Sequence, residues 1–270
     1  MQLATRTGVW AKSGSLTPSA YGGLCFTAEA ANSSVQLTAV GSAPAVTLVK
    51  SFDGVNWEEY AVGEVIEFPS IGKSVYIAAG EGGNETFGLS VSTYHKFVIG
   101  GLIAASGDIT SLRNFDLIQT PLASFCYSSM FRGCTGLTSA PELPATTLAD
   151  SCYRFMFKDC TGLTRAPELP VTMLAKSCYR QMFSGCTGLT SAPELPATTL
   201  AGFCYYSMFS GCTRISLIKA HFTVWGSQTN DWVSNVASTG TFHKPSALPE
   251  EFATDRIPTG WTVVNIDKTT

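Results

Sequence analysis

A 26-residue internal repeat constrains the fold of this chain more than any other feature of its sequence. Three consecutive units, at residues 126–151, 152–177 and 178–203, are identical in 17 of their 26 columns. A fourth unit begins at Cys204 and loses the pattern after Thr213, and partial matches upstream extend the repeat in the other direction. A unit this short cannot bury its apolar sides alone, so about five layers are expected to stack, with irregular ends.

The apolar residues of each unit indicate two short elements. Cys152, Met156 and Cys160 recur every four residues and predict one apolar face of a short helix. Leu137, Ala140 and Leu143 recur every three residues and predict a short extended segment, interrupted by the proline that follows Ala140 because proline lacks a backbone N–H. One strand and one helix per unit predict an α+β solenoid.

The repeat sequence resembles a known family. The motif C-T-G-L-T, followed by a Pro-bounded turn and by L-A-x-x-C-Y and x-M-F-x-x-C, is similar to the BspA-type leucine-rich repeats of Bacteroidota surface proteins, which also occur in phages of those bacteria. The resemblance covers about residues 115–221. It implies a leucine-rich-repeat solenoid, and a role in adhesion or recognition rather than in catalysis.

Composition and patterning divide the chain into four regions. Residues 1–45, rich in Ala, Ser, Thr and Gly, are predicted to form an N-terminal arm or docking segment. Residues 46–105 alternate strand-like segments with turns and predict an all-β, sandwich-like module, whose strands could start as early as residue 34. Residues 106–221 form the predicted leucine-rich-repeat solenoid. Residues 222–270, with scattered Trp and Pro, are predicted to cap its last layer.

The charge balance argues against two classes of partner. The net charge is −3, and only 14% of the residues are charged, so no strong positive field exists to attract nucleic acid or anionic lipid. No apolar run approaches the roughly 20 residues that span a bilayer. The first 15 residues also lack the apolar stretch of a secretory signal. The sequence therefore predicts neither nucleic-acid binding nor membrane insertion.

Eight of the nine cysteines fall in two columns of the repeat. Each unit has the spacing Cys-x7-Cys, without the closely paired ligands of a zinc site and without an interleaved histidine. A catalytic thiol needs a nearby base, and the three histidines lie outside the regular units. We therefore expect reduced, buried thiols that act as small apolar side chains, with no metal, no cofactor and no catalytic residue. The sequence leaves the redox state of Cys25 open.

A column of carboxylates accompanies the cysteines. Glu142, Glu168 and Glu194 occupy one position in successive units, and stacked like charges are expected to face solvent. Two interpretations are open: each glutamate caps backbone N–H groups of its own turn, or the column binds Ca²⁺ or a cationic partner.

The columns that vary between otherwise matching units are candidates for ligand contact, because burial does not dictate them. They hold Arg and aromatic residues, the types that carry most interface energy. The alternative is a solvated face without function. The candidate contact surface consists of Arg132, Arg154, Phe155, Lys158, Arg165, Arg180, Gln181 and Tyr206, together with Glu142, Glu168 and Glu194.

The predicted function is recognition or adhesion without catalysis. The favoured setting is a phage virion, as a fibre, tail or capsid-decorating component that binds a glycan or protein receptor on the bacterial host. Its N-terminal module would contact other virion proteins, and a homo-oligomer is expected to strengthen weak contacts. The alternative is a bacterial cell-surface adhesin or glycan-binding protein whose leader has been removed. A third, remote hypothesis is a glycan-active enzyme.

Overall fold

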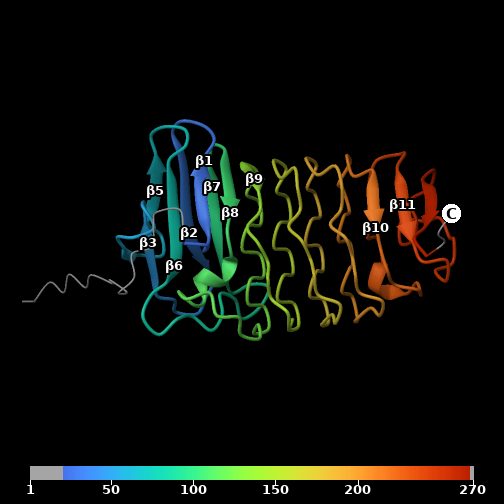
Figure 1. Ribbon diagram of the computed structural model, residues 1–270, viewed down its shortest axis with the longest axis horizontal. Coiled ribbons are helices and arrows are strands. Elements are labelled where there is room, and N and C mark those ends of the chain that lie inside the picture. Colours follow the sequence, from blue (N-terminus) through green and yellow to red (C-terminus); the bar gives the residue numbers. More distant parts are fainter. Residues whose placement is uncertain (1–20, 268–270) are drawn as a thin grey trace, which may run out of the picture.

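Two packed β-sheets form the N-terminal end of the molecule in the computed structural model, which describes residues 21–267 (Figure 1). The larger sheet has the strand order β4-β3-β6-β1-β8-β9, and the smaller has the order β5-β2-β7. All neighbouring strands pair antiparallel except β8 and β9. The strands are β1 (Cys25–Ala28), β2 (Ser33–Val40), β3 (Leu48–Ser51), β4 (Glu58–Tyr60), β5 (Val65–Phe68), β6 (Ser74–Ala79), β7 (Tyr94–Gly100), β8 (Ile103–Ser106) and β9 (Leu137–Ser139).

Alternating apolar residues hold the two sheets together. Val35 and Leu37 on β2 are fully buried, with polar residues between them on the outer face. Phe26 on β1 meets Phe97 on β7 at 4.8 Å between ring centroids, which joins the large sheet to the small one. The predicted β-sandwich-like sheets are thus present, and the Asp53-Gly54 turn lies between β3 and β4 as expected.

The boundary predicted for the N-terminal arm is wrong over residues 21–33. This stretch contains β1, which lies between β6 and β8 in the middle of the large sheet. β2, which is central in the small sheet, falls where the sequence allowed strands from about residue 34. Residues 1–20 of the predicted arm lie outside the described residues.

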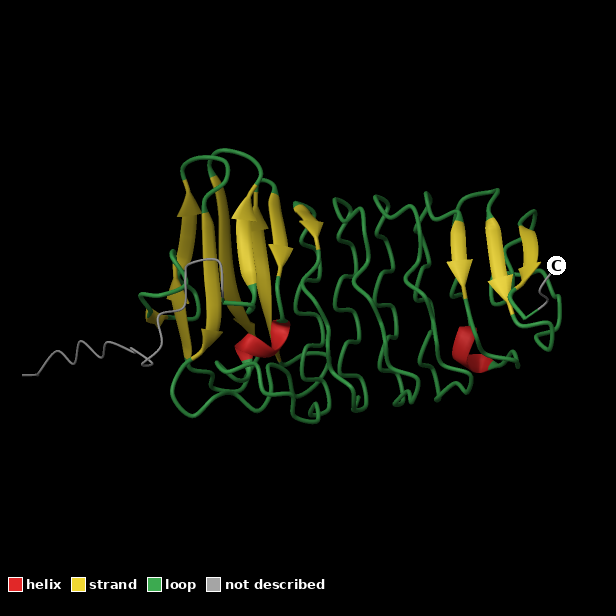
Figure 2. Ribbon diagram, viewed as in Figure 1, coloured by secondary structure: helices red, strands yellow, loops and turns green. Residues whose placement is uncertain are grey.

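The repeat units follow the sandwich as a stack of coils built mainly from turns (Figure 2). β9 of the first coil pairs parallel with β8 of the sandwich, Ile103 opposite Leu137, so the stack continues the larger sheet. A short 3₁₀ helix, η1 (Ile109–Leu112), precedes the stack. The Asp108 side chain caps this helix and accepts a hydrogen bond from the Thr110 N–H at 2.7 Å.

In the segment where the sequence predicts a helix, each unit contains a series of tight turns. Backbone N–H groups alternate between two acceptors: Cys126 and Ser128 donate three residues back, whereas Tyr127 and Ser129 donate to carbonyls of the next coil. Every fourth residue has a left-handed backbone, as at Phe125 and Ser129 with φ of 59° and 63°. In an α-helix every N–H group donates to the carbonyl four residues back, and every φ is negative. The left-handed residues therefore exclude an α-helix in this segment.

The predicted fold class, an α+β leucine-rich-repeat solenoid, is therefore wrong. The structure is nearly all β, with 25% strand and 3% helix, and its strands form three sheets. The only helices among residues 21–267 are two short 3₁₀ turns. None of the helices in this part of the chain is long and apolar enough to cross a membrane.

Of the three complete units, only the first forms a regular strand, β9, in the predicted extended segment. The proline column does not explain this difference, because Pro141 of the first unit occupies the same column as Pro167 and Pro193. Isolated bonds such as Thr164 N–H to the Thr138 carbonyl, at 3.3 Å, still join neighbouring coils on this side.

Aromatic columns fill the interior of the stack. Phe131, Phe157, Phe183 and Phe209 are fully buried, and their rings lie 5.4, 5.7 and 5.8 Å apart with nearly parallel planes. A second column, of Tyr127, Tyr153, Tyr179 and Tyr205, has centroid spacings of 5.8, 5.9 and 6.3 Å. Each stacked pair contributes about 0.5–1.5 kcal/mol beyond the burial of its area.

A parallel three-stranded sheet closes the other end of the molecule (Figure 1). Its strands are β10 (Leu217–Lys219), β11 (Thr241–Lys244) and β12 (Thr262–Asn265), and the turn η2 (Ser227–Thr229) lies between β10 and β11. Trp232 is fully buried, and its ring lies 6.5 Å from Tyr205 and 6.3 Å from Phe209. The aromatic core of the stack is thereby continued into residues 222–267.

Candidate functional site

Most of the variable-column residues proposed as a contact surface meet on the turn side of the coils. Three cations surround the half-buried Phe155 ring: Arg154 at 4.6 Å from its centroid, Arg132 at 5.6 Å and Lys158 at 5.6 Å. Cation–π contacts of this kind are worth about 0.5–1 kcal/mol each at exposed sites. They hold three charged side chains over one ring.

A second group lies one coil further along. The Arg180 guanidinium lies 4.2 Å from the Tyr206 ring centroid and 5.8 Å from that of Phe203, and these two rings meet edge to face at 6.2 Å. We refer to both groups together as the cationic–aromatic stripe, which consists of Arg132, Arg154, Phe155, Lys158, Arg180, Phe203 and Tyr206.

The turn backbone presents these side chains. Phe155 and Phe203 both have left-handed backbones, with φ of 59° and 56°. For an L-residue with a large side chain this conformation costs roughly 1–2 kcal/mol, and it is uncommon outside glycine and asparagine. The equivalent columns of other coils hold Ser129, Gln181 and Ser207 for Phe155, and Phe125, Ser151 and Ser177 for Phe203. Strained residues of this kind often lie at binding sites.

The cations of the stripe have no carboxylate partner among residues 21–267. The ion pairs of the described chain involve other basic residues, such as Lys50 and Arg256. The Nε atoms of Arg154 and Arg180 are buried and have no hydrogen-bond partner. Burial lowers the pKa of the Arg154 guanidinium, and the charge of Arg180 lowers it further. The two arginines thus lie close enough to repel each other, with bonding capacity left unused.

Gln181 lies beside this group, because it follows Arg180 in the chain and occupies the column of Phe155, with a left-handed φ of 53°. One predicted contact residue lies apart from the group. Arg165 is exposed on the opposite, sheet-bearing side, in the column of Ser139, whose hydroxyl donates to the Ala105 carbonyl on β8. Phe203 belongs to the stripe but was not predicted, because the unit boundary separates it from Tyr206 in the repeat alignment.

The glutamate column faces solvent, as predicted. Glu142, Glu168 and Glu194 are all exposed. Within the described chain none accepts a hydrogen bond from a backbone N–H of its own turn, so the capping interpretation fails. Glu194 alone is paired, with Lys219 Nζ at 2.8 Å and His221 Nε2 at 2.6 Å, and these hydrogen bonds lower the pKa of its carboxyl group.

The cysteine columns do not form a reactive site. All eight ladder thiols are buried and free, which confirms the predicted burial, and Cys25 is also free. Cys160 and Cys186 donate their S–H groups to the Phe131 and Phe157 carbonyls of the preceding coil, each at 2.9 Å. Burial raises the pKa of Cys134 to about 12. No group of three potential metal ligands occurs among the residues that the structure describes.

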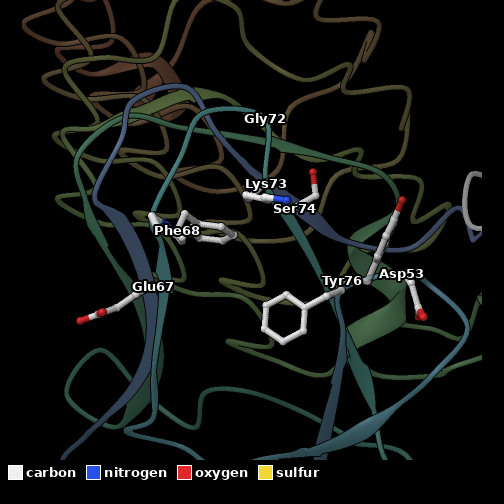
Figure 3. Close-up of a pocket in the computed structure, with 9 residues that line it drawn as sticks. Asp53, Glu67, Phe68, Gly72, Lys73, Ser74 and Tyr76 are labelled. Atoms are coloured by element: carbon white, nitrogen blue, oxygen red, sulfur yellow. The ribbon is translucent and has the colours of Figure 1, made fainter.

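An open pocket of about 450 Å³ lies on the sandwich between the β3–β4 loop and the β5–β6 turn (Figure 3). Tyr76, Phe68 and Lys73 contribute to its walls. Asp53 lies at its edge, and its carboxylate accepts the Val55 and Asn56 N–H groups at 2.9 and 2.7 Å. These hydrogen bonds lower its pKa, so the carboxylate serves its own loop. Sequence reasoning gave no indication of this pocket.

In comparisons with known proteins, the chain matches no family model, no curated protein and no solved structure. The assignment of a site therefore rests on its own geometry. The cationic–aromatic stripe combines several unpaired charges, unused hydrogen-bond donors and strained aromatic residues. The glutamate column, the thiols and the sandwich pocket do not combine these three features.

Proposed function

We propose that this chain is a non-catalytic recognition protein that binds the surface of a bacterial host through the cationic–aromatic stripe. The observation that carries the proposal is the group of four half-buried cations, Arg132, Arg154, Lys158 and Arg180, which lie over aromatic rings and have no carboxylate partner among residues 21–267. Arg154 and Arg180 lie close enough to repel each other in the unbound protein. An anionic ligand relieves that repulsion.

Rigid display is the proposed mechanism. Inter-coil hydrogen bonds fix the backbone beside the stripe: Phe155 N–H donates to the Arg180 carbonyl at 3.0 Å, and Ser129 N–H donates to the Arg154 carbonyl at 2.9 Å. The rings over which the guanidinium groups lie restrict their rotamers. Little conformational entropy is therefore lost when a ligand binds.

The proposed setting is a phage virion, in keeping with the resemblance of the repeats to those found in phages of Bacteroidota. The N-terminal sandwich, opposite the C-terminal sheet, would contact other virion proteins. Quantitative proteomics of purified virions and of outer-membrane fractions tests this setting. Enrichment in virions supports it, and enrichment in the outer membrane replaces it with a cell-surface adhesin.

Binding to intact cells tests the recognition function itself. A chain labelled at its C-terminus is incubated with a panel of Bacteroidota and measured by flow cytometry. We expect saturable binding to some strains, reduced at least tenfold by the double substitution Arg154→Ala/Arg180→Ala. The matched control, Lys73→Ala/Arg214→Ala, removes two exposed cations outside the stripe and should leave binding unchanged. Equal binding by both double variants would refute the role of the stripe.

A further inference from the structure

The charge pattern of the stripe defines the chemistry of its ligand. Four cations, Arg132, Arg154, Lys158 and Arg180, gather on one side of a chain whose net charge is −3. The acidic residue Asp150 in the same coil accepts the Lys176 backbone N–H at 3.1 Å instead of pairing with them. An anionic ligand would therefore meet positive charge without first displacing a protein carboxylate.

Arginine geometry narrows the class of anion. A guanidinium presents paired N–H groups that match the two oxygens of a carboxylate or a sulfate. Arg154 and Arg180 lie on neighbouring coils, and because their Nε atoms are buried, a ligand would meet their terminal Nη groups. Neighbouring strands lie about 4.8 Å apart, and coils stacked in the same way place the two guanidinium groups, each a fork of N–H donors, a short distance from each other. A polymer with repeated acidic groups can occupy both at once, which a single small anion cannot do.

The aromatic residues argue against nucleic acid as this polymer. Proteins that bind single strands stack bases on exposed ring faces. Here Phe155 is half-buried and surrounded by three cations, and Tyr206 is covered by Arg180 at 4.2 Å. These two rings support the arginines, so Phe203 is the stripe residue left to offer an exposed ring to a base. Neutral donors nearby, such as Gln181 and Ser184, suit hydroxyl groups between acidic ones.

We infer that the stripe is a binding site for an acidic polysaccharide, whose carboxylate or sulfate groups pair with Arg154 and Arg180 while its hydroxyl groups contact the neutral side chains beside them. This inference rests on the proposed recognition function and specifies its ligand. Lys158 and Arg132 would add longer-range attraction at the first of the two coils.

Binding to immobilised polymers tests the inference. Polygalacturonate provides carboxylates, dextran sulfate provides sulfates, unmodified dextran is the neutral control, and oligo(dT) represents nucleic acid. We expect the full chain to bind at least one acidic polysaccharide at least tenfold more tightly than dextran and than oligo(dT). The carboxylated and sulfated arms show which acidic group is preferred. Equal affinity for dextran, or tighter binding of oligo(dT), would overturn the inference.

Variants connect that binding to the stripe. Arg154→Ala/Arg180→Ala should lose at least tenfold in affinity, and Lys73→Ala/Arg214→Ala should bind as tightly as the unsubstituted chain. Arg180→Lys keeps the charge but removes the fork, so an intermediate loss of affinity is expected even if the double variant folds poorly. Unchanged affinity in Arg180→Lys and in the double variant would contradict the assignment.

The two proposals can fail separately. Stripe-dependent binding to cells without binding to any acidic polysaccharide would refute this inference and leave the recognition function standing. Binding to acidic polysaccharide without any binding to cells would refute the proposed function alone.

Discussion

Backbone strain and the proposed ligand contact coincide at a single residue, Phe155. Its φ of 59° places a large side chain in the left-handed region, at a cost of roughly 1–2 kcal/mol, while its ring holds three cations in place. Phe125 has the same φ of 59° and contacts none of the cations of the stripe. A comparison of the two residues therefore distinguishes the effect of backbone strain from the effect of contact with the cations.

Substituting each phenylalanine with glycine tests this separation. A glycine relieves the left-handed strain, which offsets part of the packing lost with the ring, so we expect Phe155→Gly and Phe125→Gly to change the unfolding free energy by only about 1 kcal/mol. Only Phe155→Gly should weaken polysaccharide binding, by at least fivefold. Urea denaturation and the polymer-binding assay measure the two effects. A loss of stability of more than about 3 kcal/mol, typical of an ordinary buried aromatic, would show that the strain is absent.

At the scale of elements, the turns of each coil explain why the sequence pattern identified the buried residues correctly and yet predicted a helix that does not form. The four-residue recurrence of Cys152, Met156 and Cys160 identified the buried face, and these residues are fully buried. The same recurrence suggested a helix, because a helix also returns to one face after nearly four residues. A turn series with every fourth residue left-handed produces an equal spacing. Periodicity alone does not distinguish the two.

The left-handed positions did leave a signal in the sequence. Gly133, Gly185 and Gly211 share one column, with φ of 76–78°, and Asp159 occupies it in the remaining unit with φ of 63°. Gly and Asp tolerate this backbone best, so a glycine column inside an apparent helix indicated a turn. The grouping of the stripe residues was easier to anticipate, since variable columns in a repeat fall where packing imposes no choice. The unpaired Nε atoms, by contrast, depend on side-chain packing that no sequence pattern encodes.

The columns of buried thiols predict a loss of stability in alkaline solution. Burial raises the pKa of Cys126 to about 11 and those of Cys134 and Cys212 to about 12. A thiol in the unfolded chain has a pKa near 8.5, so the contribution of each buried thiol is fully present below about pH 8.5 and is lost as the pH rises toward 12. At about pH 10, roughly 1.5 units above the pKa of the unfolded thiol, we expect a loss of about 2 kcal/mol for each of these three thiols. Urea denaturation between pH 7 and pH 10 measures it.

Thiol reactivity provides the control for that experiment. Because the thiolate is the reactive form, the native chain should react slowly with a thiol-specific chromogenic reagent at pH 8, and all nine thiols should react after unfolding. Rapid reaction of several thiols in the native state, or stability that stays constant up to pH 10, would contradict the buried assignment.

At the scale of the whole molecule, one continuous core extends from the sandwich through the coils to the C-terminal sheet. Phe97 of the sandwich stacks on Phe131 of the first coil at 5.3 Å, and Trp232 covers Phe209 of the last. Neither end of the coil stack is left open to solvent, as stacked repeats require. The acceptors for inter-coil hydrogen bonds recur every 26 residues, so any two coils should be able to become neighbours.

Removing one whole unit tests this equivalence. Deletion of residues 152–177 joins Ser151 to Cys178 and would stack Phe131 directly on Phe183, with every column kept in register. We expect a folded chain that is less stable by about 1–3 kcal/mol, the contribution of two stacked ring pairs. Because Arg154, Phe155 and Lys158 are lost with the unit, acidic polysaccharide should no longer bind. Circular dichroism, thermal unfolding and the polymer-binding assay measure these outcomes.

A deletion one residue shorter is the matched control. Removing residues 152–176 leaves an extra Ser177 before the next unit, which displaces every apolar and left-handed column by one position relative to its neighbour. Buried thiols and rings would then face solvent, and glycines would no longer coincide with the left-handed positions, so this variant should unfold or aggregate. Equal stability of the two deletions would mean that the coils tolerate slippage and that register does not determine the stack. A difference between them would show that the 26-residue period itself specifies which coil surfaces can meet, and therefore where the arginine forks are placed.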